Sequence, residues 1–343
     1  MTALELADGG AQVRIVDRQR AAMESSWAGG GIVSPLYPWR YAPAITALAT
    51  WSQTAYPRLL ARLVETTGID AEWLQNGMLV TATSERADAL AWGQGLNARV
   101  HAITPADANS LEPHVTLSEP PLWMPEIASV RTPRLGQALR AACLMHPRID
   151  LLEGQLVALL GTVAKPEAIV DGMPLKSAQI LIAAGAWTAG LLSGLGVECP
   201  IKPMKGQMLL FAPCHLVSRV VLCDGRYAIP RADGRLVFGS TLEDVGFQRT
   251  PDRQAFEELM HEAIRLIPAL SDVPLEAQWA GFRPGSPGGM PWIGALSESL
   301  WVNAGHFRNG VVLAPASARL MADMMLSRTP GIDPAPYQPR NHG

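Results

Sequence analysis

The spacing of hydrophobic and polar positions changes several times along the chain and predicts both helices and strands. Over 42–67, apolar side chains recur at spacings that give a long helix one buried face. Alternating or continuous apolar runs predict strands at 77–81, 207–211, 226–230, 236–240, 277–282 and 300–303. Further helices are predicted at 84–96, 105–111, 134–145, 188–195, 251–267 and 314–326. The intermixed elements indicate an α/β plus α+β fold.

The start of the chain follows the order helix, glycine turn, strand and terminal acid. Residues 2–7 predict the second half of a helix that ends at Asp8-Gly9-Gly10, and 11–17 alternate as a strand that closes on Asp17. This order is the second half of a Rossmann βαβ unit, in which the acid accepts hydrogen bonds from an adenosine ribose. A surface acid at a strand end is the alternative.

Elements of the dinucleotide-binding type occur at the start, middle and end of the sequence, which argues for two interleaved domains. We predict a nucleotide-binding domain of 1–76, 134–200 and 277–330, and a second domain of 77–133 and 201–276 on a large antiparallel sheet. Residues 149–160 and 169–182 add strands with a hairpin turn at Asp171-Gly172, while proline-rich turns dominate 120–133.

Composition narrows the function classes. The chain has 343 residues, of which 48% are hydrophobic and 17% charged, as in ordinary globular proteins. A net charge of −3 with scattered basic residues argues against a nucleic-acid partner. No apolar window reaches the ~18 residues of a spanning helix, and no signal peptide opens the chain. Without Cys-x-x-Cys pairs or metal-ligand spacing, we expect no metal, a cytoplasmic location and free thiols, with a Cys214–Cys223 bridge as the alternative.

Two glycine-containing segments are candidates for binding an anionic cofactor. Ser25 and Ser26 precede the run Gly29-Gly30-Gly31, which offers hydroxyls and backbone N–H groups to a pyrophosphate or a flavin ring. Gly305-His306-Phe307-Arg308-Asn309-Gly310 precedes a helix whose N-terminus favours negative charge, such as that of a reduced flavin. A flexible loop and a structural histidine are the alternative interpretations.

The segment around Arg283 is a candidate for binding the carboxylate of a substrate. Arg283 ends a predicted strand just before Pro284-Gly285, a position that presents a guanidinium at a loop mouth. Tyr227 lies on a predicted strand and can point its phenol into the same cavity. A surface ion pair for Arg283 and a packing role for Tyr227 remain open.

The chain resembles the glycine oxidase and D-amino-acid oxidase family. The resemblance runs from Thr2 to about Leu326 and rests on Glu24-Ser25-Ser26-Trp27-Ala28-Gly29-Gly30-Gly31, Ala183-Ala184-Gly185-Ala186-Trp187, Trp279-Ala280-Gly281-Phe282-Arg283-Pro284-Gly285 and Ala304-Gly305-His306-Phe307-Arg308-Asn309-Gly310. It implies a Rossmann-type FAD-binding domain interleaved with a substrate domain on a large antiparallel sheet. The residues that it implies for FAD binding are Asp17, Arg18, Ser25, Ser26, Gly30, Gly31, Ile32, Val157, Gly185, Trp187, His306, Phe307, Arg308, Asn309, Gly310, Val311 and Val312.

The same resemblance implies the substrate residues. Arg283 matches the arginine that binds the substrate carboxylate, Tyr227 the tyrosine beside it, and Arg308 a second arginine on the substrate side. The sequence departs from the family where methionines are replaced by Ile32 and Leu242, and a histidine by Gly225. Residues 34–40 are also bulkier than a site for glycine alone requires, so the resemblance leaves the preferred substrate open.

Family members begin with a strand and a G-x-G-x-x-G turn about 15 residues before the position of Thr2. This sequence includes neither. We expect the natural chain to start further upstream. A chain that begins at Met1 would lack a buried strand and the helix N-terminus that holds the pyrophosphate, so we expect it to lose tight FAD binding.

The implied reaction is oxidative deamination of glycine, sarcosine or small D-amino acids to a 2-oxo acid, ammonia or an amine, and hydrogen peroxide. Its partners would be a small amino acid and oxygen. The family also implies possible self-association and a link to thiamine biosynthesis. Three alternatives stay open: a dehydrogenase that passes electrons to a quinone or carrier, a flavin domain of a larger RNA-modifying enzyme, and an inactive remnant.

Overall fold

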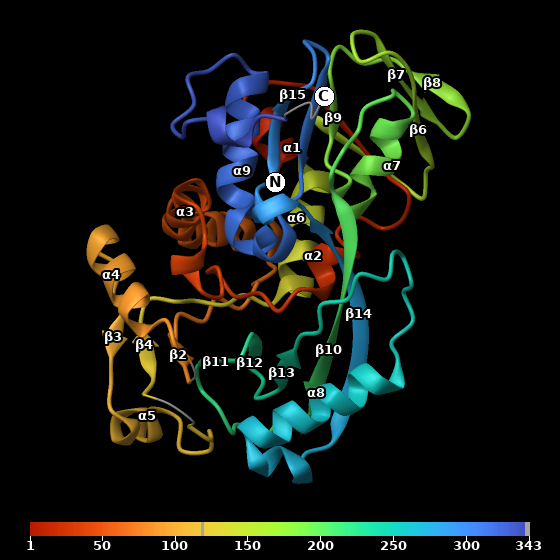
Figure 1. Cartoon of the computed structure of the whole chain (residues 1–343). Helices are drawn as coiled ribbons and strands as arrows, with labels where there is room; N and C mark the ends of the chain where they lie inside the picture. Colours follow the sequence, from red (N-terminus) through yellow and green to blue (C-terminus); the bar gives the residue numbers. More distant parts are fainter. Residues whose placement is uncertain (82, 118–119, 340–343) are drawn as a thin grey trace.

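The computed structural model describes residues 1–81, 83–117 and 120–339. Figure 1 shows an upper part made of helices and small sheets, and a lower part built on one large sheet. The helices are α1 (Thr2–Asp8), α2 (Ser25–Ala28), α3 (Pro43–Thr67), α4 (Arg86–Leu96), α5 (Pro105–Leu111), α6 (Thr132–Met145), α7 (Thr188–Ser193), α8 (Arg253–Leu266) and α9 (Gly310–Met325).

The strands of the upper part form three small sheets. They are β1 (Val13–Asp17), β5 (Ile149–Glu153), β6 (Val157–Gly161), β7 (Pro166–Val170), β8 (Met173–Leu175), β9 (Ile180–Ile182), β15 (Trp292–Ala295) and β16 (Leu300–Ala304). Two of these pairs are parallel, β1 with β5 and β16 with β9. Parallel pairs drawn from the start, middle and end of the chain are what an interleaved nucleotide-binding domain requires.

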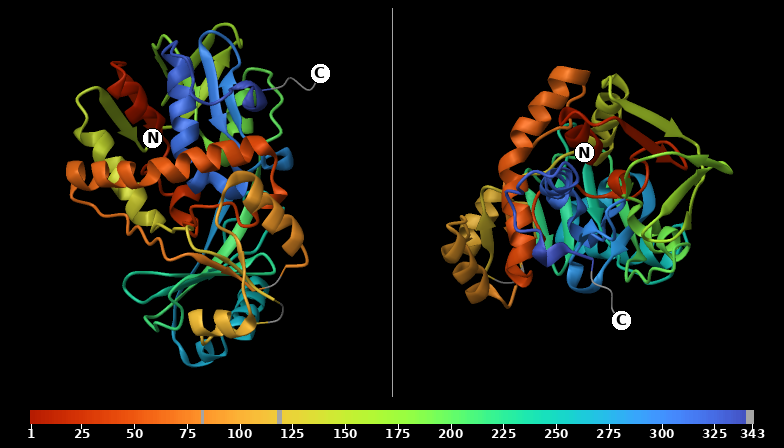
Figure 2. Two further views of the ribbon diagram at one scale, coloured as in Figure 1. Left: turned by 90° about the vertical axis from the view of Figure 1, so that its left-hand side faces the viewer. Right: turned by 90° about the horizontal axis from the view of Figure 1, so that it is seen from above.

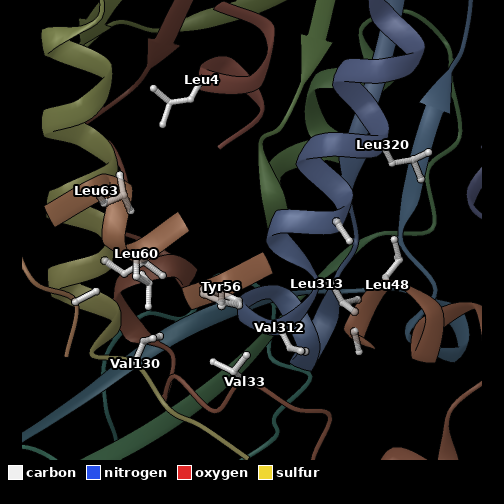
Figure 3. Close-up of a cluster of buried hydrophobic side chains, with 14 of the residues drawn as sticks. Leu4, Val33, Leu48, Tyr56, Leu60, Leu63, Val130, Val312, Leu313 and Leu320 are labelled. Carbon is white, nitrogen blue, oxygen red and sulfur yellow. The ribbon is translucent and has the colours of Figure 1, made fainter. Parts of the chain in front are cut away.

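The core of the upper part lies between α3 and α9. Helix α3 begins with Pro43 at its first turn and ends at Gly68, which has φ 70° and donates its N–H to the Val64 carbonyl. Its buried residues are spaced three or four apart, so one face of the helix is covered. Figure 3 shows Tyr56 of α3 meeting Val312 and Leu313 of α9, and the left view of Figure 2 shows α3 crossing α9.

The lower part is one eight-stranded sheet in the order β14-β10-β13-β12-β11-β2-β4-β3. Its strands are β2 (Met78–Val80), β3 (His101–Ala102), β4 (Leu122–Met124), β10 (Lys202–Phe211), β11 (Val220–Cys223), β12 (Arg226–Pro230), β13 (Leu236–Gly239) and β14 (Leu275–Gly285). The expected antiparallel sheet is in fact mixed, because β2 and β11 pair in parallel. No hairpin joins these two strands, so no tight turn imposes the antiparallel direction.

The two faces of this sheet bury different side chains. Met208, Tyr227 and Ile229 belong to a cluster on the face toward the upper part, whereas Leu209 and Phe238 pack with α8 on the other face. Paired residues of neighbouring strands share a face, and successive residues alternate. Arg283 pairs with Met204, whose place in the alternation along β10 puts Arg283 on the same face as Tyr227.

Most predicted elements lie within a few residues of the observed ones, and α5 and β12 coincide with their predictions. The predicted hairpin turn at Asp171-Gly172 joins β7 and β8. Two corrections apply: the region 149–160 is divided into β5 and β6 at Gly154, and β4 interrupts the proline-rich turns of 120–133. The cysteines are free, so the Cys214–Cys223 alternative is wrong. The boundary predicted at 277 falls inside β14, and the domain limits stay a prediction.

Gly281 allows α2 to approach β14. A Cβ at this position would lie 2.4 Å from the Cβ of Ala28, so Gly281→Ala must push the two elements apart. We expect the free energy of unfolding to fall by about 1–3 kcal/mol, measured by urea denaturation. Gly190→Ala in α7 is the control, because nothing lies within 4 Å of the added methyl group. Equal midpoints for wild type and Gly281→Ala would contradict the close packing.

Candidate functional site

A serine hydroxyl joins Tyr227 and Arg283 at the upper face of the large sheet. Arg283 Nη2 donates to Ser240 Oγ at 2.6 Å, and Arg283 Nη1 donates to the Thr241 carbonyl at 3.2 Å. Tyr227 Oη lies 3.1 Å from the same Ser240 oxygen. Ser240 follows β13 directly and was missed by sequence reasoning, although its hydroxyl at a predicted strand end was a usable signal.

The Arg283 guanidinium is a desolvated cation. It lies over Gly206, where a Cβ would be only 1.9 Å from Nη1. Burial lowers the pKa of Arg283, the nearby Tyr227 opposes that shift, and the charge of Arg308 adds to it. Arg283 forms no ion pair within the described part of the chain. Because a charge that has lost part of its hydration is costly unless it is paired, this partly buried guanidinium is suited to receive an anion.

The predicted glycine segment faces this pair. A Cβ on Gly30 would lie 2.7 Å from Ile229 Cδ1 and 3.0 Å from Tyr227 Cε2. Gly31 has φ 90°, and a Cβ there would lie 1.9 Å from the Val130 carbonyl oxygen, so only glycine fits. Ile32 is 8% exposed and packs in the same cluster as Tyr227.

A buried arginine that the sequence reasoning missed supports this segment. Arg231 Nη2 donates to the Gly30 carbonyl at 2.8 Å, and Nη1 donates to the Val130 carbonyl at 3.1 Å. Burial lowers the pKa of Arg231 to about 10. The guanidinium therefore fixes the backbone of the glycine segment from the side opposite its N–H groups. A lone Arg after a strand carries no sequence signal for this role.

The N-terminus of α9 contributes the predicted His-Phe-Arg-Asn-Gly block. Asn309 is 2% exposed and its Nδ2 has no hydrogen-bond partner among the described residues. Arg308 Nη2 donates only weakly to the Gly225 carbonyl, at 3.5 Å. His306 Nε2 lies 3.1 Å from Ser317 Oγ, and burial lowers the pKa of His306 to about 4, so the ring is neutral at pH 7.

The two valines that follow have different environments. The Val311 carbonyl accepts a hydrogen bond from Tyr56 Oη at 2.6 Å, and its side chain lies close to Gly29. The Val312 side chain packs in the core between α3 and α9. Val312 therefore can face a cofactor only with its backbone.

Asp17, Arg18 and Val157, predicted for the adenosine end, lie near the end of β1, and Trp187 of the turn predicted beside the flavin contacts Arg18 there. Asp17 Oδ1 accepts from the Gln19 N–H at 3.1 Å, and burial raises the pKa of Asp17. The Arg18 guanidinium lies 4.0 Å above the Trp187 ring. Gly185 has φ 54°, with open space where a Cβ would point. Val157 begins β6, two residues after Gln155, whose N–H donates to the Asp17 carbonyl at 3.0 Å.

The loop 244–250 connects the large sheet with this region and was not predicted. Phe247 stacks on Trp187 with ring centroids 5.0 Å apart, and Arg249 pairs with Glu24 at 2.6 Å. Ser25 donates to the Phe282 carbonyl, whereas Ser26 is exposed. These contacts join residues that are 60 or more positions apart in the chain and leave no local pattern.

A cavity of about 590 Å³ opens beside Arg308 and is also lined by Tyr37, Arg40, Tyr41 and Gly225. In the described residues, no group of three or more His, Cys, Asp or Glu could hold a metal ion. None of the helices in those parts of the chain is both long and apolar enough to cross a membrane.

Comparison with known proteins identifies the family to which the chain belongs. The model of the FAD dependent oxidoreductase family, DAO, matches residues 1–324. The chain belongs to this family.

Relatives of the chain include oxidases that it matches over nearly their full length. Glycine oxidase of Pseudomonas aeruginosa is 44% identical over 347 residues, which cover 99% of this chain and 95% of the relative. The crystal structure of glycine oxidase from Geobacillus kaustophilus superposes with a TM-score of 0.93 at 27% identity, covering 100% of this chain and 95% of that one. The bifunctional protein ThiO/ThiG of Nostoc is 28% identical over 95% of this chain and 51% of its own length.

The residues of this FAD dependent oxidoreductase fit the cofactor that defines its family. Helix α9 has 16 residues and directs its free N–H groups, with the unpaired Asn309 amide beside them, toward its N-terminal end. A Cβ on Gly30 or Gly31 would meet Ile229 or Val130, so these glycines let the backbone of the segment pack closely against the chain beside the site. A donor set that favours negative charge suits a flavin, whose reduced ring is an anion.

The neutral His306 makes stability depend on pH. Its pKa in the folded chain, about 4, lies below the ordinary histidine value of 6.5, so the unfolded chain takes up the proton first as the pH falls. The stabilisation is fully present above pH 6.5 and is lost between about pH 6.5 and 4. We expect His306→Gln to flatten this part of the pH profile of the unfolding midpoint. The exposed His261→Gln is the control, and identical profiles for both variants would contradict the assignment.

Proposed function

We propose that the protein oxidises the amine of glycine and related small amino acids, such as sarcosine, with oxygen as the electron acceptor. One observation carries the proposal: the unpaired Arg283 guanidinium, bonded to Ser240 beside Tyr227, faces the glycine segment on one side of the sheet. The names of the relatives, glycine oxidases at up to 44% identity over nearly the full chain, support the same reaction.

The substrate carboxylate would bind Arg283. A guanidinium presents two parallel N–H donors to a carboxylate, and these charge-assisted bonds gain strength where water is excluded. Tyr227 would donate its phenol hydrogen to the same carboxylate. Ser240, to which Tyr227 now donates, would keep the hydrogen bond that it accepts from Arg283. Hydrogen bonds from both Arg283 and Tyr227 would fix the orientation of the substrate α-carbon. A fixed orientation of the reacting atoms raises the rate of the reaction.

The cations also control the protonation of the substrate amine. Arg283 and Arg308 are close enough for one charge to lower the pKa of the other. Their field disfavours a bound ammonium group and therefore favours the neutral amine, the form that can release a hydride from its α-carbon. When bound, FAD supplies the acceptor for that hydride and passes the electrons on to oxygen. Asn309 and the α9 N-terminus would stabilise the negative charge that this transfer creates.

The cellular setting follows from the same proposal. The four free cysteines suit a reducing compartment, and we propose a cytoplasmic location. The similarity to ThiO/ThiG proteins supports a place in thiamine biosynthesis. Self-association stays a prediction.

Removing the Arg283 guanidinium tests the carboxylate site. We expect Arg283→Ala to raise KM for glycine ~100-fold or more, because two charge-assisted hydrogen bonds are lost. Arg283→Lys keeps the charge but loses the two parallel N–H donors. Its KM for glycine should therefore lie between those of Arg283→Ala and wild type. Oxygen uptake measures the effect, with the exposed Arg253→Ala as the control. An unchanged KM in Arg283→Ala would remove the residue from the site.

The reaction itself is tested on the FAD-loaded protein under anaerobic conditions. We expect the visible flavin absorption to bleach on addition of glycine or sarcosine, and peroxide to form in equal amount to the oxygen consumed when air is admitted. An absorption spectrum that does not change with glycine, sarcosine or D-alanine would refute the proposed function. Bleaching without peroxide would assign the electrons to another acceptor.

A further inference from the structure

Three consecutive residues of β10 serve the two faces of the large sheet differently. Gly206 lies beneath the Arg283 guanidinium on the face toward the upper part, where an added Cβ would be 1.9 Å from Arg283 Nη1. Because side chains alternate along a strand, Lys205 and Gln207 point to the opposite face, where α8 packs (Figure 1). One strand therefore leaves room for a cation on one face and places two polar side chains on the other.

Lys205 is a buried cation with two acidic partners. It is 3% exposed, and its Nζ lies 3.2 Å from Glu243 Oε2 and 3.2 Å from Asp252 Oδ2. The backbones pair as well, since the Lys205 N–H donates to the Glu243 carbonyl at 2.9 Å and the Glu243 N–H donates to the Lys205 carbonyl at 2.9 Å. A buried ammonium group requires such partners. Lys205 therefore holds both carboxylates on the α8 face of the sheet.

Gln207 and Thr241 bind the other oxygen of the Glu243 carboxylate. Gln207 Nε2 donates to Glu243 Oε1 at 2.9 Å, and Thr241 Oγ1 donates to the same oxygen. The backbone N–H of Gln207 in turn donates to Thr241 Oγ1 at 2.9 Å. Both oxygens of Glu243 are therefore occupied by groups from β10 and from its own segment.

The segment that carries Glu243 also holds Arg283 from the other side. Arg283 Nη1 donates to the carbonyl of Thr241, only two residues before Glu243, at 3.2 Å. Burial lowers the pKa of Arg283, and the charge of Glu243 is among the groups that oppose this shift. A carboxylate near a guanidinium normally pairs with it. Both residues lie in the described part of the chain, yet no ion pair joins them there, because the oxygens of Glu243 are already bound.

We propose that Lys205 is a positioning residue of the carboxylate site: it holds the Glu243 carboxylate on the α8 face and so keeps Arg283 free to bind the substrate. The side-chain amide of Gln207 supports the same arrangement. The inference rests on the proposed function, in which Arg283 binds the carboxylate of glycine. It adds the requirement that a neighbouring acid has a cation of its own.

Removing the Lys205 charge would change the balance around Arg283. Glu243 would lose its cation partner, and its charge would then compete for Arg283 and repel the carboxylate of the substrate. Both effects weaken the binding of glycine, whereas the hydride transfer from glycine that has bound is affected less. The expected result is therefore a higher KM with little change in kcat.

Steady-state oxygen uptake by the FAD-loaded enzyme tests the proposal. We expect Lys205→Met to raise KM for glycine roughly 10-fold, with kcat within about twofold of wild type. The double variant Lys205→Met/Glu243→Gln should return KM to within about threefold of wild type, because the new glutamine has no charge but its Oε1 still accepts from Thr241 and Gln207. A role of Lys205 in packing alone predicts no such rescue.

Lys202→Met is the matched control. Lys202 lies on the same strand and pairs with Asp244, the acid next to Glu243, but this pair is exposed. Because exposed ion pairs contribute little, KM for glycine should stay within about twofold of wild type. The dissociation constant of FAD, measured by flavin fluorescence, should be the same for Lys205→Met and wild type, since Lys205 lies on the α8 face of the sheet.

Acetate has a carboxylate like that of glycine but no amine, and it reports carboxylate binding without turnover. Titration of the FAD-loaded enzyme, followed by the flavin absorption spectrum, should give a dissociation constant for acetate about 10-fold higher in Lys205→Met than in wild type. The double variant should again reverse the change. Lys205→Gln keeps a hydrogen-bond donor without the charge and provides the same comparison if Lys205→Met does not fold.

The outcomes separate the two proposals. If wild type oxidises glycine but KM is the same in Lys205→Met, or if adding Glu243→Gln does not lower the raised KM, the role of Lys205 is overturned while the proposed function stands. If wild type oxidises neither glycine nor sarcosine, the proposed function fails and the inference fails with it. A KM that rises in Lys205→Met, falls again in the double variant and stays at its wild-type value in Lys202→Met supports the role.

Discussion

The partly buried cation of Arg283 is the constraint on which the arrangement of the site depends. A guanidinium taken out of water must find hydrogen-bond partners, and in this chain they are a hydroxyl and a backbone carbonyl that follow β13. Space for the side chain exists because β10 carries Gly206 beneath it. The lack of a carboxylate partner in the described part of the chain leaves the charge available to a ligand. The edge of the large sheet is therefore built for an anion.

The second half of the site comes from the interleaved upper part. Core packing between α3 and α9 determines where the α9 N-terminus lies, and with it Arg308 and Asn309. The buried Arg231 and the glycines at 30 and 31 bring the backbone of another segment against the same sheet. Arg308 of this part lies close enough to Arg283 of the sheet for its charge to lower the pKa of Arg283, so the two cations favour the binding of a carboxylate between the two parts.

The cavity beside Arg308 adds a second cationic side chain, Arg40, to the surroundings of the site. Its wall includes residues of 36–41, Phe307 and Arg308, and the β11–β12 turn, where Gly225 has no side chain. The bulky segment 34–40 and the replacement at Gly225 are two of the departures from the family that the sequence shows. In the structure they face each other through the Tyr37–Gly225 hydrogen bond. Two sequence changes that look independent therefore shape one feature, which bears on the choice of substrate.

The sequence by itself determined the local elements, the family and the residue types of the site. Helix α3, strand β12 and the Asp171-Gly172 turn follow from periodicity and turn chemistry, which depend on near neighbours. Family motifs carry over Arg283, Tyr227 and Arg308 as candidates. Only the tertiary structure decided that β2 and β11 run in parallel, that Ser240 joins Tyr227 to Arg283, that Arg231 supports Gly30 and that Phe247 stacks on Trp187. These contacts join residues far apart in the chain, and their formation depends on how the buried faces pack, which no local pattern specifies.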